Sequence, residues 1–312
     1  MTGYIYDKNG KETLLPPLLS WDISIGSGEP CDSFEVCCAY EAKYLKALSQ
    51  ACRFRAAHGG KTVFSGRIDE YEVRISDDGG TVSVCGRSLA ALLLDNEAEA
   101  SEYLNLSPEL LSERHIKSYG ISVSIGTGLK TLSGFAVTQG ESEWSVVKRF
   151  CSLCGCPEPR FSQDGTLLLG VHGGAAVTIN DQSPMTEIRH RDCRYGMISA
   201  VLVKNRSTGA KYGVSNQPFI DRGGSSRRII TVPRKTGAEA MRYTAAYQIK
   251  QSAKGKFTVS LKLPSQFPAK PGDTVRFDSR RLGLKGGFTV TRLRSFAGGS
   301  EAGSELTMEV RT

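Results

Sequence analysis

The segment from Lys61 to Asp95 limits the folds open to this chain more than any other, because it specifies consecutive strands joined by a tight turn. Apolar side chains alternate with polar ones from Phe64 to Ile68 and again from Tyr71 to Ile75, which is the period of two expected for half-buried strands. The phase of this alternation slips by one residue between the two stretches. We therefore predict a β-bulge or sharp bend at Asp69 and Glu70.

The rest of this segment predicts a hairpin partner and a short helix. Two aspartates followed by two glycines at 77–80 are typical of a tight turn, and apolar residues alternate again from Thr81 to Cys85. An apolar stretch from Leu89 to Leu94 follows. Ser88 is its expected N-cap, because a serine hydroxyl can accept a hydrogen bond from a backbone N–H of the first helical turn.

Size and composition indicate an ordinary globular protein of two or three domains. The chain has 312 residues, of which 39% are hydrophobic and 23% are charged, and a domain usually holds ~100–150 residues. No apolar run approaches the ~20 residues that span a bilayer, so we expect no membrane insertion of this chain. The N-terminus lacks a signal-peptide pattern, from which we expect the protein to stay in the cytosol of the cell that makes it.

Periodicity divides the chain into three expected domains within an α+β, mainly β fold class. Residues 1–98 contain six or so strand-like stretches and a short helix near Tyr44–Ala51, which predicts a closed or nearly closed β-barrel with few exposed sheet edges. Residues 99–184 predict a small inserted α/β module. Residues 185–312 return to strand periodicity with one helix and predict a second β-barrel.

Two helices with clear boundaries define the expected α/β module. Ser107 followed by Pro108 is typical of an N-cap and a first helical position, and Gly120 is a natural stop. A second helix is expected from about Ser142 to Leu153, before a hairpin that turns at 163–165. The apolar stripe of this second helix has helical spacing and consists of Trp144, Val147, Cys151 and Cys154.

The third region predicts one helix followed by several strands. Residues Gly237–Gln251 show helical spacing, and apolar residues alternate from Phe257 to Leu263. A turn is expected at Pro271–Asp273. Further strands are expected at Phe288–Val290 and at Leu306–Val310.

Three cysteines, Cys151, Cys154 and Cys156, form the sharpest chemical motif. A Cys-x-x-Cys pair can act as a redox couple or supply half of a zinc site. Here the pair lies at the C-terminal end of the expected helix and on its apolar stripe, whereas a reactive thiol is favoured at a helix N-terminus. We therefore favour a structural role in the core, with no metal and no cofactor bound.

No other motif indicates catalysis. The nine cysteines are odd in number and follow no secretion signal, so reduced thiols are expected. His190-Arg191-Asp192 resembles one kinase triplet, but the other kinase motifs are missing. The sequence also contains no Gly-x-Ser-x-Gly, His-Glu-x-x-His or phosphate-binding loop. We expect a protein that is not an enzyme.

Several of these motifs resemble the baseplate hub proteins of contractile-tailed phages and phage-like tail bacteriocins. The family pattern of a strand, a hairpin, a Gly-Arg-Ser sequence and a short Leu- and Ala-rich helix is similar to Phe64–Ile68 and Val82–Asp95. The start of the module helix and the closing strands also match, at Gly140–Trp144, Pro271–Val275, Gly287–Val290 and Leu306–Met308. The resemblance thus spans most of the chain in order.

The resemblance implies a structural function in a tail particle. Hub proteins of this family are trimers whose chains each carry two tube-like β-barrels, so three chains form a pseudo-sixfold ring. Such a ring is a symmetry adaptor between the sixfold tail tube and the threefold spike. The implied partners are the tail tube protein, the central spike protein and baseplate wedge proteins, with passive passage of DNA through the lumen. The implied location is the tail baseplate of a phage or of a headless particle.

Two groups of side chains are candidates for partner contacts. The first group lies on the bulged strand pair and comprises Phe64, Arg67, Tyr71 and Arg74. The second group is basic and comprises Arg222, Arg227, Arg228, Arg280 and Arg281. We expect the strands at Phe64–Ile75 and Phe257–Phe277 to form the wall of the ring.

Two other classes of function stay open. One is an enzyme, either a tail-associated cell-wall hydrolase or a thiol-redox module that uses Cys151 and Cys154. The other is a nucleic-acid-binding β-barrel protein, because the chain has 40 Lys and Arg against 32 Asp and Glu, a formal charge of +8. No aromatic-stacking motif supports this last interpretation, so solvated loop charge or complementarity to an acidic protein partner accounts better for the basic loops.

Overall fold

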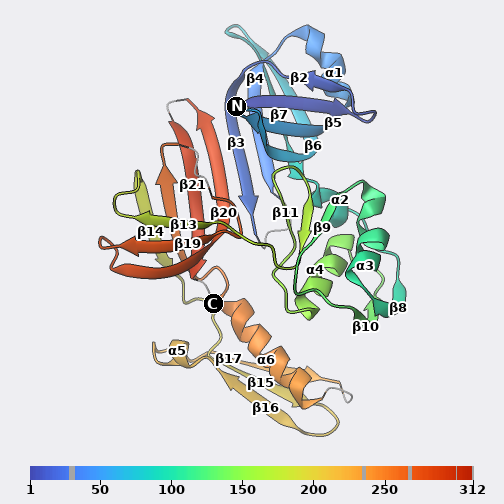
Figure 1. Cartoon of the computed structure of the whole chain (residues 1–312), viewed down its shortest axis with the longest axis vertical. Coiled ribbons are helices and arrows are strands. Elements are labelled where there is room, and N and C mark those ends of the chain that lie inside the picture. The colour runs from blue at the N-terminus through green and yellow to red at the C-terminus, as the bar shows by residue number, and fades with distance from the viewer. Residues whose placement is uncertain (28–31, 234–236, 266–268, 300, 311–312) are drawn as a thin grey trace. The chain divides into compact units, whose positions relative to one another are not determined.

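The computed structural model describes residues 1–312 apart from 28–31, 234–236, 266–268, 300 and 311–312. Strands dominate the structure (Figure 1), so the predicted α+β, mainly β fold class is confirmed. Contacts divide the chain into two compact units, Met1–Glu187 with Leu261–Met308 and Ile188–Ser260 with Glu309–Thr312. The larger unit contains two strand-rich halves and an α/β module.

The N-terminal half of the larger unit is an antiparallel sheet over an aromatic core. Its strands have the order β3-β4-β7-β6-β5-β1-β2. The rings of Phe34 and Phe54 stack with 4.1 Å between centroids, and Phe64 lies 5.3 Å from Phe34. The strands are β1 (Thr2–Asp7), β2 (Glu12–Leu14), β3 (Leu18–Gly26), β4 (Ser33–Ala39), β5 (Ala51–His58), β6 (Lys61–Ser76) and β7 (Gly79–Ser88), with α1 (Leu45–Gln50) before β5.

Two local predictions for this half have opposite outcomes. The bulge is confirmed, because the register of β6 against β7 shifts between Ile68 and Glu70. The helix cap is wrong: α2 (Ala90–Leu94) begins after Leu89 without a side-chain cap. Ser88 instead ends β7, and its buried hydroxyl accepts a hydrogen bond from the backbone N–H of Asp32 at 3.3 Å. Because the Ser88 hydroxyl is bonded to Asp32, it does not cap the helix.

The C-terminal strands have the order β14-β18-β21-β20, with β19 beside β20 and β13 beside β19. Alternate residues of these strands are fully buried, among them Leu261, Phe277 and Met308, as the period-two pattern predicts. The strands are β13 (Ala176–Asn180), β14 (Glu187–Asp192), β18 (Phe257–Leu263), β19 (Thr274–Ser279), β20 (Leu284–Gly298) and β21 (Glu301–Val310).

The α/β module follows α2 and forms around the two expected helices. Ser107 caps α3 (Pro108–His115) by accepting the N–H of Leu110 at 3.2 Å, and Ser142 caps α4 (Glu143–Leu153) in the same way. The predicted cap at Ser107 is therefore confirmed, and the second helix starts at the expected place. The module's strands are β8 (Ser101–Leu106), β9 (Val123–Ile125), β10 (Leu132–Val137), β11 (Arg160–Phe161) and β12 (Leu167–Leu169).

The smaller unit includes nearly all of β14 and the first four residues of β18, and the rest of it is a three-stranded sheet with one long helix. The strands β15 (Ala200–Asn205), β16 (Lys211–Ser215) and β17 (Arg227–Val232) have the order β16-β15-β17. Helix α6 (Ala238–Ala253) contributes Met241 and Ala245 to a core shared with Val201 and Val203. The short helix α5 (Gln217–Ile220) lies between β16 and β17 in the sequence.

Strand periodicity predicts that this stretch belongs to the second barrel, but it has a core of its own. Strand alternation is the same in a barrel strand and in a strand that packs on a helix, so the pattern did not separate the two. Among the described residues, no helix has both the length and the apolar character needed to cross a membrane.

The aromatic core of the N-terminal half gives a stability prediction. We expect Phe64→Ala to lower the free energy of unfolding by about 3–5 kcal/mol, because loss of a fully packed ring leaves a cavity. Urea unfolding of the full chain, followed by tryptophan fluorescence, measures the change. Leu104→Ala is the matched control, since Leu104 is 88% exposed, and it should change stability by less than about 0.5 kcal/mol. An unchanged midpoint for Phe64→Ala would contradict the core position of this ring.

Candidate assembly interface

The two strand-rich halves are joined edge to edge by one pair of strands. β3 and β20 lie side by side (Figure 1) and pair antiparallel from Arg292–Gly26 to Ala297–Trp21. The first part of β20, from Leu284 to Thr289, pairs with β19 instead. A single long strand therefore passes from the sheet of one half into the sheet of the other.

Side chains on this joint reinforce the backbone pairing. The Arg294 guanidinium donates to the Asp22 carboxylate at 3.0 Å, and Nε of Arg292 donates to Oγ of Ser24 at 2.9 Å. The carboxylate raises the pKa of the Arg294 guanidinium. Arg294 and Asp22 are both partly exposed, so solvent screening limits this pair to a modest share of the stability. Backbone hydrogen bonds between β3 and β20 therefore contribute most of the stability of the joint.

The two halves repeat one order of strands. β5, β6 and β7 form a meander with a middle strand of 16 residues, and β19, β20 and β21 form a second with a middle strand of 15 residues. Beyond β7 come β4 and β3, and beyond β21 come β18 and β14. In this order β20 corresponds to β6, and β14 corresponds to β3. One pairing differs, since β1 is antiparallel to β5 whereas β13 is parallel to β19.

The strand that corresponds to β20 has an open edge. β6 pairs with β5 only from Lys61 to Arg67, and its remainder pairs with β7 alone among the described strands. The stretch Asp69–Ser76 therefore offers unpaired backbone groups along one side, and Ile75 on it is 74% exposed. In β20 the matching edge is covered by β3. Such an edge is a template for pairing with another chain.

A bidentate ion pair fixes the bulge where this edge begins. Arg87 donates to Asp69 at 2.6 Å and to Asp95 at 2.8 Å. The guanidinium lowers the pKa of the Asp95 carboxyl below its usual value. The pair therefore adds stability above pH ~4, where Asp95 would already be ionised in the unfolded chain, and this stability is lost as the pH falls further.

Two glycines make the close strand approach at the bulge possible. A Cβ on Gly66 would lie 2.3 Å from the carbonyl oxygen of Arg87, and one on Gly86 would lie 2.0 Å from that of Arg67. Neither position has room for a side chain, because the neighbouring atoms belong to the backbone. Glycine at these two positions is thus a packing requirement of β6 and β7.

The predicted interface residues on β6 have different positions. Phe64 is only 2% exposed and packs in the aromatic core, so we withdraw it as a contact residue. Tyr71 is half-buried against the same core. Arg67 and Arg74 are exposed, and Arg74 lies on the open edge. The strand thus contributes charged side chains of both signs to its exposed side and aromatic ones to its core.

The predicted basic residues lie in two places. Arg222, Arg227 and Arg228 belong to the smaller unit, where Arg222 forms an ion pair with Asp192. Arg228 donates to the side chain of Gln248 on α6 at 2.8 Å. Arg280 and Arg281 are exposed in the turn between β19 and β20. The structure therefore does not bring the five arginines together within one unit.

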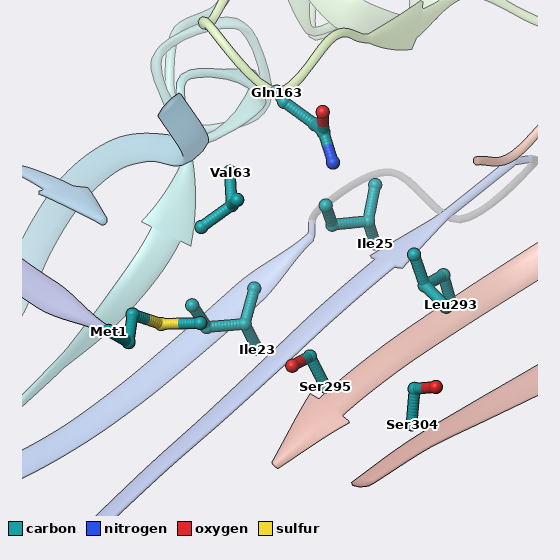
Figure 2. Close-up of a pocket in the computed structure, with 8 residues that line it drawn as sticks. All are labelled: Met1, Ile23, Ile25, Val63, Gln163, Leu293, Ser295 and Ser304. Carbon is teal, nitrogen blue, oxygen red and sulfur yellow. The ribbon is translucent and has the colours of Figure 1, made fainter. Parts of the chain in front are cut away.

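A small hollow lies on the face of the joint (Figure 2). Its lining is mainly apolar and comprises Met1, Ile23, Ile25, Val63, Gln163, Leu293, Ser295 and Ser304. Its volume of about 50 Å³ is far below the ~300–1,000 Å³ of small-molecule sites, and its lining side chains include no acid, base or thiol. The hollow fits an apolar side chain better than a substrate.

The three cysteines of the motif lie in or beside the core of the α/β module. Cys151 is fully buried, and burial raises the pKa of its thiol to about 12. Cys154 and Cys156 pack beside the same core, and the described residues contain no group of three or more His, Cys, Asp or Glu side chains able to hold a metal. A thiol with a raised pKa is a poor nucleophile, which argues against the redox alternative.

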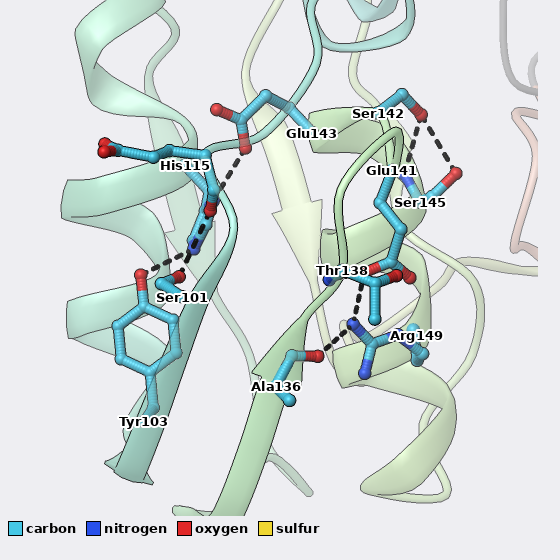
Figure 3. A network of polar contacts seen from close by, with 11 residues as sticks. Ser101, Tyr103, His115, Ala136, Thr138, Glu141, Ser142, Glu143, Ser145 and Arg149 are labelled. Carbon is cyan, nitrogen blue, oxygen red and sulfur yellow. Dashed lines mark hydrogen bonds and ion pairs between the residues drawn. The ribbon is translucent and has the colours of Figure 1, made fainter.

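A buried polar network in the module has no clear signal in the sequence (Figure 3). Nδ1 of His115 lies 2.7 Å from Glu143, and Nε2 lies 3.0 Å from the hydroxyl of Tyr103. Tyr119 donates to the second oxygen of the same carboxylate at 3.2 Å. His115 and Glu143 are both buried. Each polar group of the network has a partner, so it links α3 to α4 and serves the fold.

Comparison with known proteins supports the fold at low sequence identity. No protein-family model and no curated protein matches the chain. Among solved structures, the 43 kDa tail protein of prophage MuSo2 from Shewanella oneidensis is 16% identical, with a TM-score of 0.83 over 99% of this chain and 98% of that one. The tail protein from Neisseria meningitidis MC58 is 17% identical, with a TM-score of 0.77 over 98% and 95%.

A third similar structure comes from a secretion system. The Escherichia coli c3393 protein, a component of the type VI secretion system described as similar to the T4 phage tail proteins gp27 and gp5, is 10% identical. Its TM-score is 0.57 over 95% of this chain and 74% of that one. The chain therefore has the fold of prophage tail proteins, in agreement with the resemblance of its motifs.

The glycine contacts at the bulge give a second prediction. We expect Gly86→Ala to destabilise the fold by about 1–3 kcal/mol or more, because the new methyl group forces backbone atoms apart. Gly287→Ala is the matched control within a strand, since nothing lies within 4 Å of its Cβ position. Urea unfolding of both full-length variants measures the difference. Equal midpoints would contradict the tight approach of β6 and β7.

Proposed function

We propose that this chain is the structural baseplate hub of a contractile injection tail. Three copies form a ring that presents six similar barrel positions to the tail tube and threefold symmetry to the spike. Its location would be the baseplate of a phage or phage-like tail particle, after synthesis in the bacterial cytoplasm. The prophage tail proteins that share its fold support this proposal, as does the similarity of c3393 to gp27 and gp5.

The observation that carries the proposal is the repeated strand order with one filled and one open edge. Within the chain, β20 extends beyond β19 and its free edge is covered by β3. The corresponding edge of β6 is open, and β14 corresponds to β3 in the strand order. Pairing β6 of one copy with β14 of the next would repeat the intramolecular joint between chains.

Repetition of this contact would generate a closed ring. The contact is heterologous, since it joins two different surfaces, and such contacts give rings when the rotation closes. Each chain supplies two halves, so three chains supply six positions of nearly equal geometry. Closure would also remove the open β6 edge, which otherwise invites aggregation.

Charge on the two strands agrees with this pairing. The open stretch of β6 carries the exposed acids Glu70 and Glu72 beside one exposed base, Arg74, and β14 carries the exposed bases Arg189 and Arg191 between Glu187 and Asp192. The joint within the chain uses the same chemistry in the ion pair of Asp22 with Arg294. Opposite charges on neighbouring strands stabilise pairing, and like charges oppose it.

The remaining parts of the proposal follow from the ring. β6 and the strands from β18 to β19 would form its wall around a lumen through which DNA passes passively. The stretch 99–184 would contact baseplate wedge proteins, and the boundaries at 98 and 184 stay predictions. Arg280 and Arg281 are exposed cations for a partner contact.

Charge reversal and rescue test the β6–β14 contact. We expect the wild-type protein, alone or with its spike, to have the mass of a trimer in analytical ultracentrifugation. Glu70→Arg with Glu72→Arg should weaken the trimer at least about tenfold, because several like-charge contacts of ~0.2–1 kcal/mol each are created. Adding Arg189→Glu and Arg191→Glu in the same chain should restore it.

The control for this experiment is an equal change of charge outside the strand. Glu99→Arg with Glu102→Arg alters two exposed acids of the module and should leave the trimer intact. A monomeric wild-type protein, both alone and with its spike, would contradict the hub proposal. A trimer that survives the β6 reversal would keep the hub and refute this strand pair.

A further inference from the structure

Positive charge is concentrated in the smaller unit. Residues 188–260 contain 15 Lys and Arg against three Asp and Glu, whereas the whole chain contains 40 against 32. The rest of the chain is therefore slightly acidic, with 25 basic residues against 29 acidic ones. Such asymmetry between parts of one chain indicates an anionic partner for the basic part.

The sheet of this unit has one covered and one open face. Val201 and Val203 point into the core with Met241 and Ala245 of α6. Successive residues of a strand point to opposite faces, so the residues between them in β15 belong to the other face. Together with their cross-strand partners they form the open face, which consists of Ala200, Leu202, Lys204, Lys211, Gly213, Ser215, Arg227, Ile229 and Thr231.

The open face has an apolar centre between cations. Leu202 pairs with Gly213 on one side and with Ile229 on the other, and Ile229 is 48% exposed. Lys204 and Lys211 lie on one side of this centre and Arg227 on the other. The nine residues of the open face include no carboxylate and no aromatic ring.

Two lysines on this face lie opposite each other, and their repulsion lowers the stability of the strand pair. Lys204 and Lys211 are direct partners across β15 and β16, and like charges in this position oppose strand pairing. Two of the three acids in residues 188–260 have other partners: Asp192 is paired with Arg222, and Asp221 accepts a hydrogen bond from Gln217 at 2.7 Å. An anionic ligand seated on the face would remove this repulsion.

We propose that the open face binds an acidic segment of a partner protein, with carboxylates on either side of an apolar side chain. Carboxylates would meet Lys204, Lys211 and Arg227, and the apolar side chain would cover Leu202 and Ile229. Nucleic acid fits less well, because phosphates gain nothing from an apolar centre and the face offers no ring on which a base could stack. The contact does not depend on ring formation.

Peptide probes test the chemistry of the open face. The full chain is titrated with two fluorescent ten-residue peptides of equal charge, one alternating Glu with Leu and the other Glu with Ser, and with a 20-base-pair DNA duplex. We expect the Glu–Leu peptide to bind about tenfold more tightly than the Glu–Ser peptide, because burial of one Leu contributes ~1.5–3 kcal/mol. Ile229→Ser, at a half-exposed position, should remove most of this preference.

Charge variants locate the binding surface. Lys204→Glu, Lys211→Glu and Arg227→Glu together should weaken peptide binding at least about tenfold. The matched control, Arg194→Glu, Arg242→Glu and Lys250→Glu, changes three exposed cations outside the face by the same charge and should change binding less than about twofold. Circular dichroism checks that the variants are folded.

Two results would overturn the proposal. Equal weakening by both triple variants would mean that only diffuse charge attracts the peptide. Tighter binding of the duplex than of either peptide, unchanged by Ile229→Ser and steeply dependent on salt, would favour nucleic acid instead. Ultracentrifugation of the same samples reports ring formation separately, so failure of the hub proposal and failure of this one are distinguishable.

Discussion

The backbone pairing of β3 with β20 is the constraint on which the larger unit depends. It joins residues as far apart in sequence as Asp22 and Arg294, 272 positions from each other. The chain segment between them, which includes the α/β module and the smaller unit, is therefore a closed loop. Contacts this distant form late and slow the folding of β proteins, so the module and the smaller unit, each with its own core, can fold before the joint closes.

The same joint explains why β6 matters beyond its own half. Gly66 and Gly86 let β6 and β7 approach closely at the bulge, and Arg87 holds the bulged residue Asp69. Past this point β6 has left β5 and offers its outer edge. A bulge bends and twists its strand, and this one lies next to the point where the pairing of β6 with β5 ends.

Local sequence signals predicted the local structure and little of the long-range structure. The alternation around Ile68 gave the bulge, and Ser107 and Ser142 gave the helix starts, because these signals involve neighbours in sequence. Ser88 was assigned wrongly because its partner, Asp32, is 56 positions away. Phe64 was assigned to an interface because alternation shows that one face of a strand is apolar, but not whether a core or a partner covers it. The pairing of β3 with β20 and the contact of His115 with Glu143 leave no periodic trace in the sequence.

The two candidate surfaces would bind through different interactions, and this difference affects which partners each one selects. An open strand edge binds through backbone groups that every chain possesses, so its selectivity must come from register and from the charges of neighbouring strands. The open face of the smaller unit binds through side chains, with cations around an apolar centre, and so selects by composition. Copies of the same chain suit the strand-edge contact, because the pairing of β3 with β20 already provides the same geometry within each chain. A different protein suits the open face of the smaller unit, because this contact does not require the partner to have the same fold as the chain.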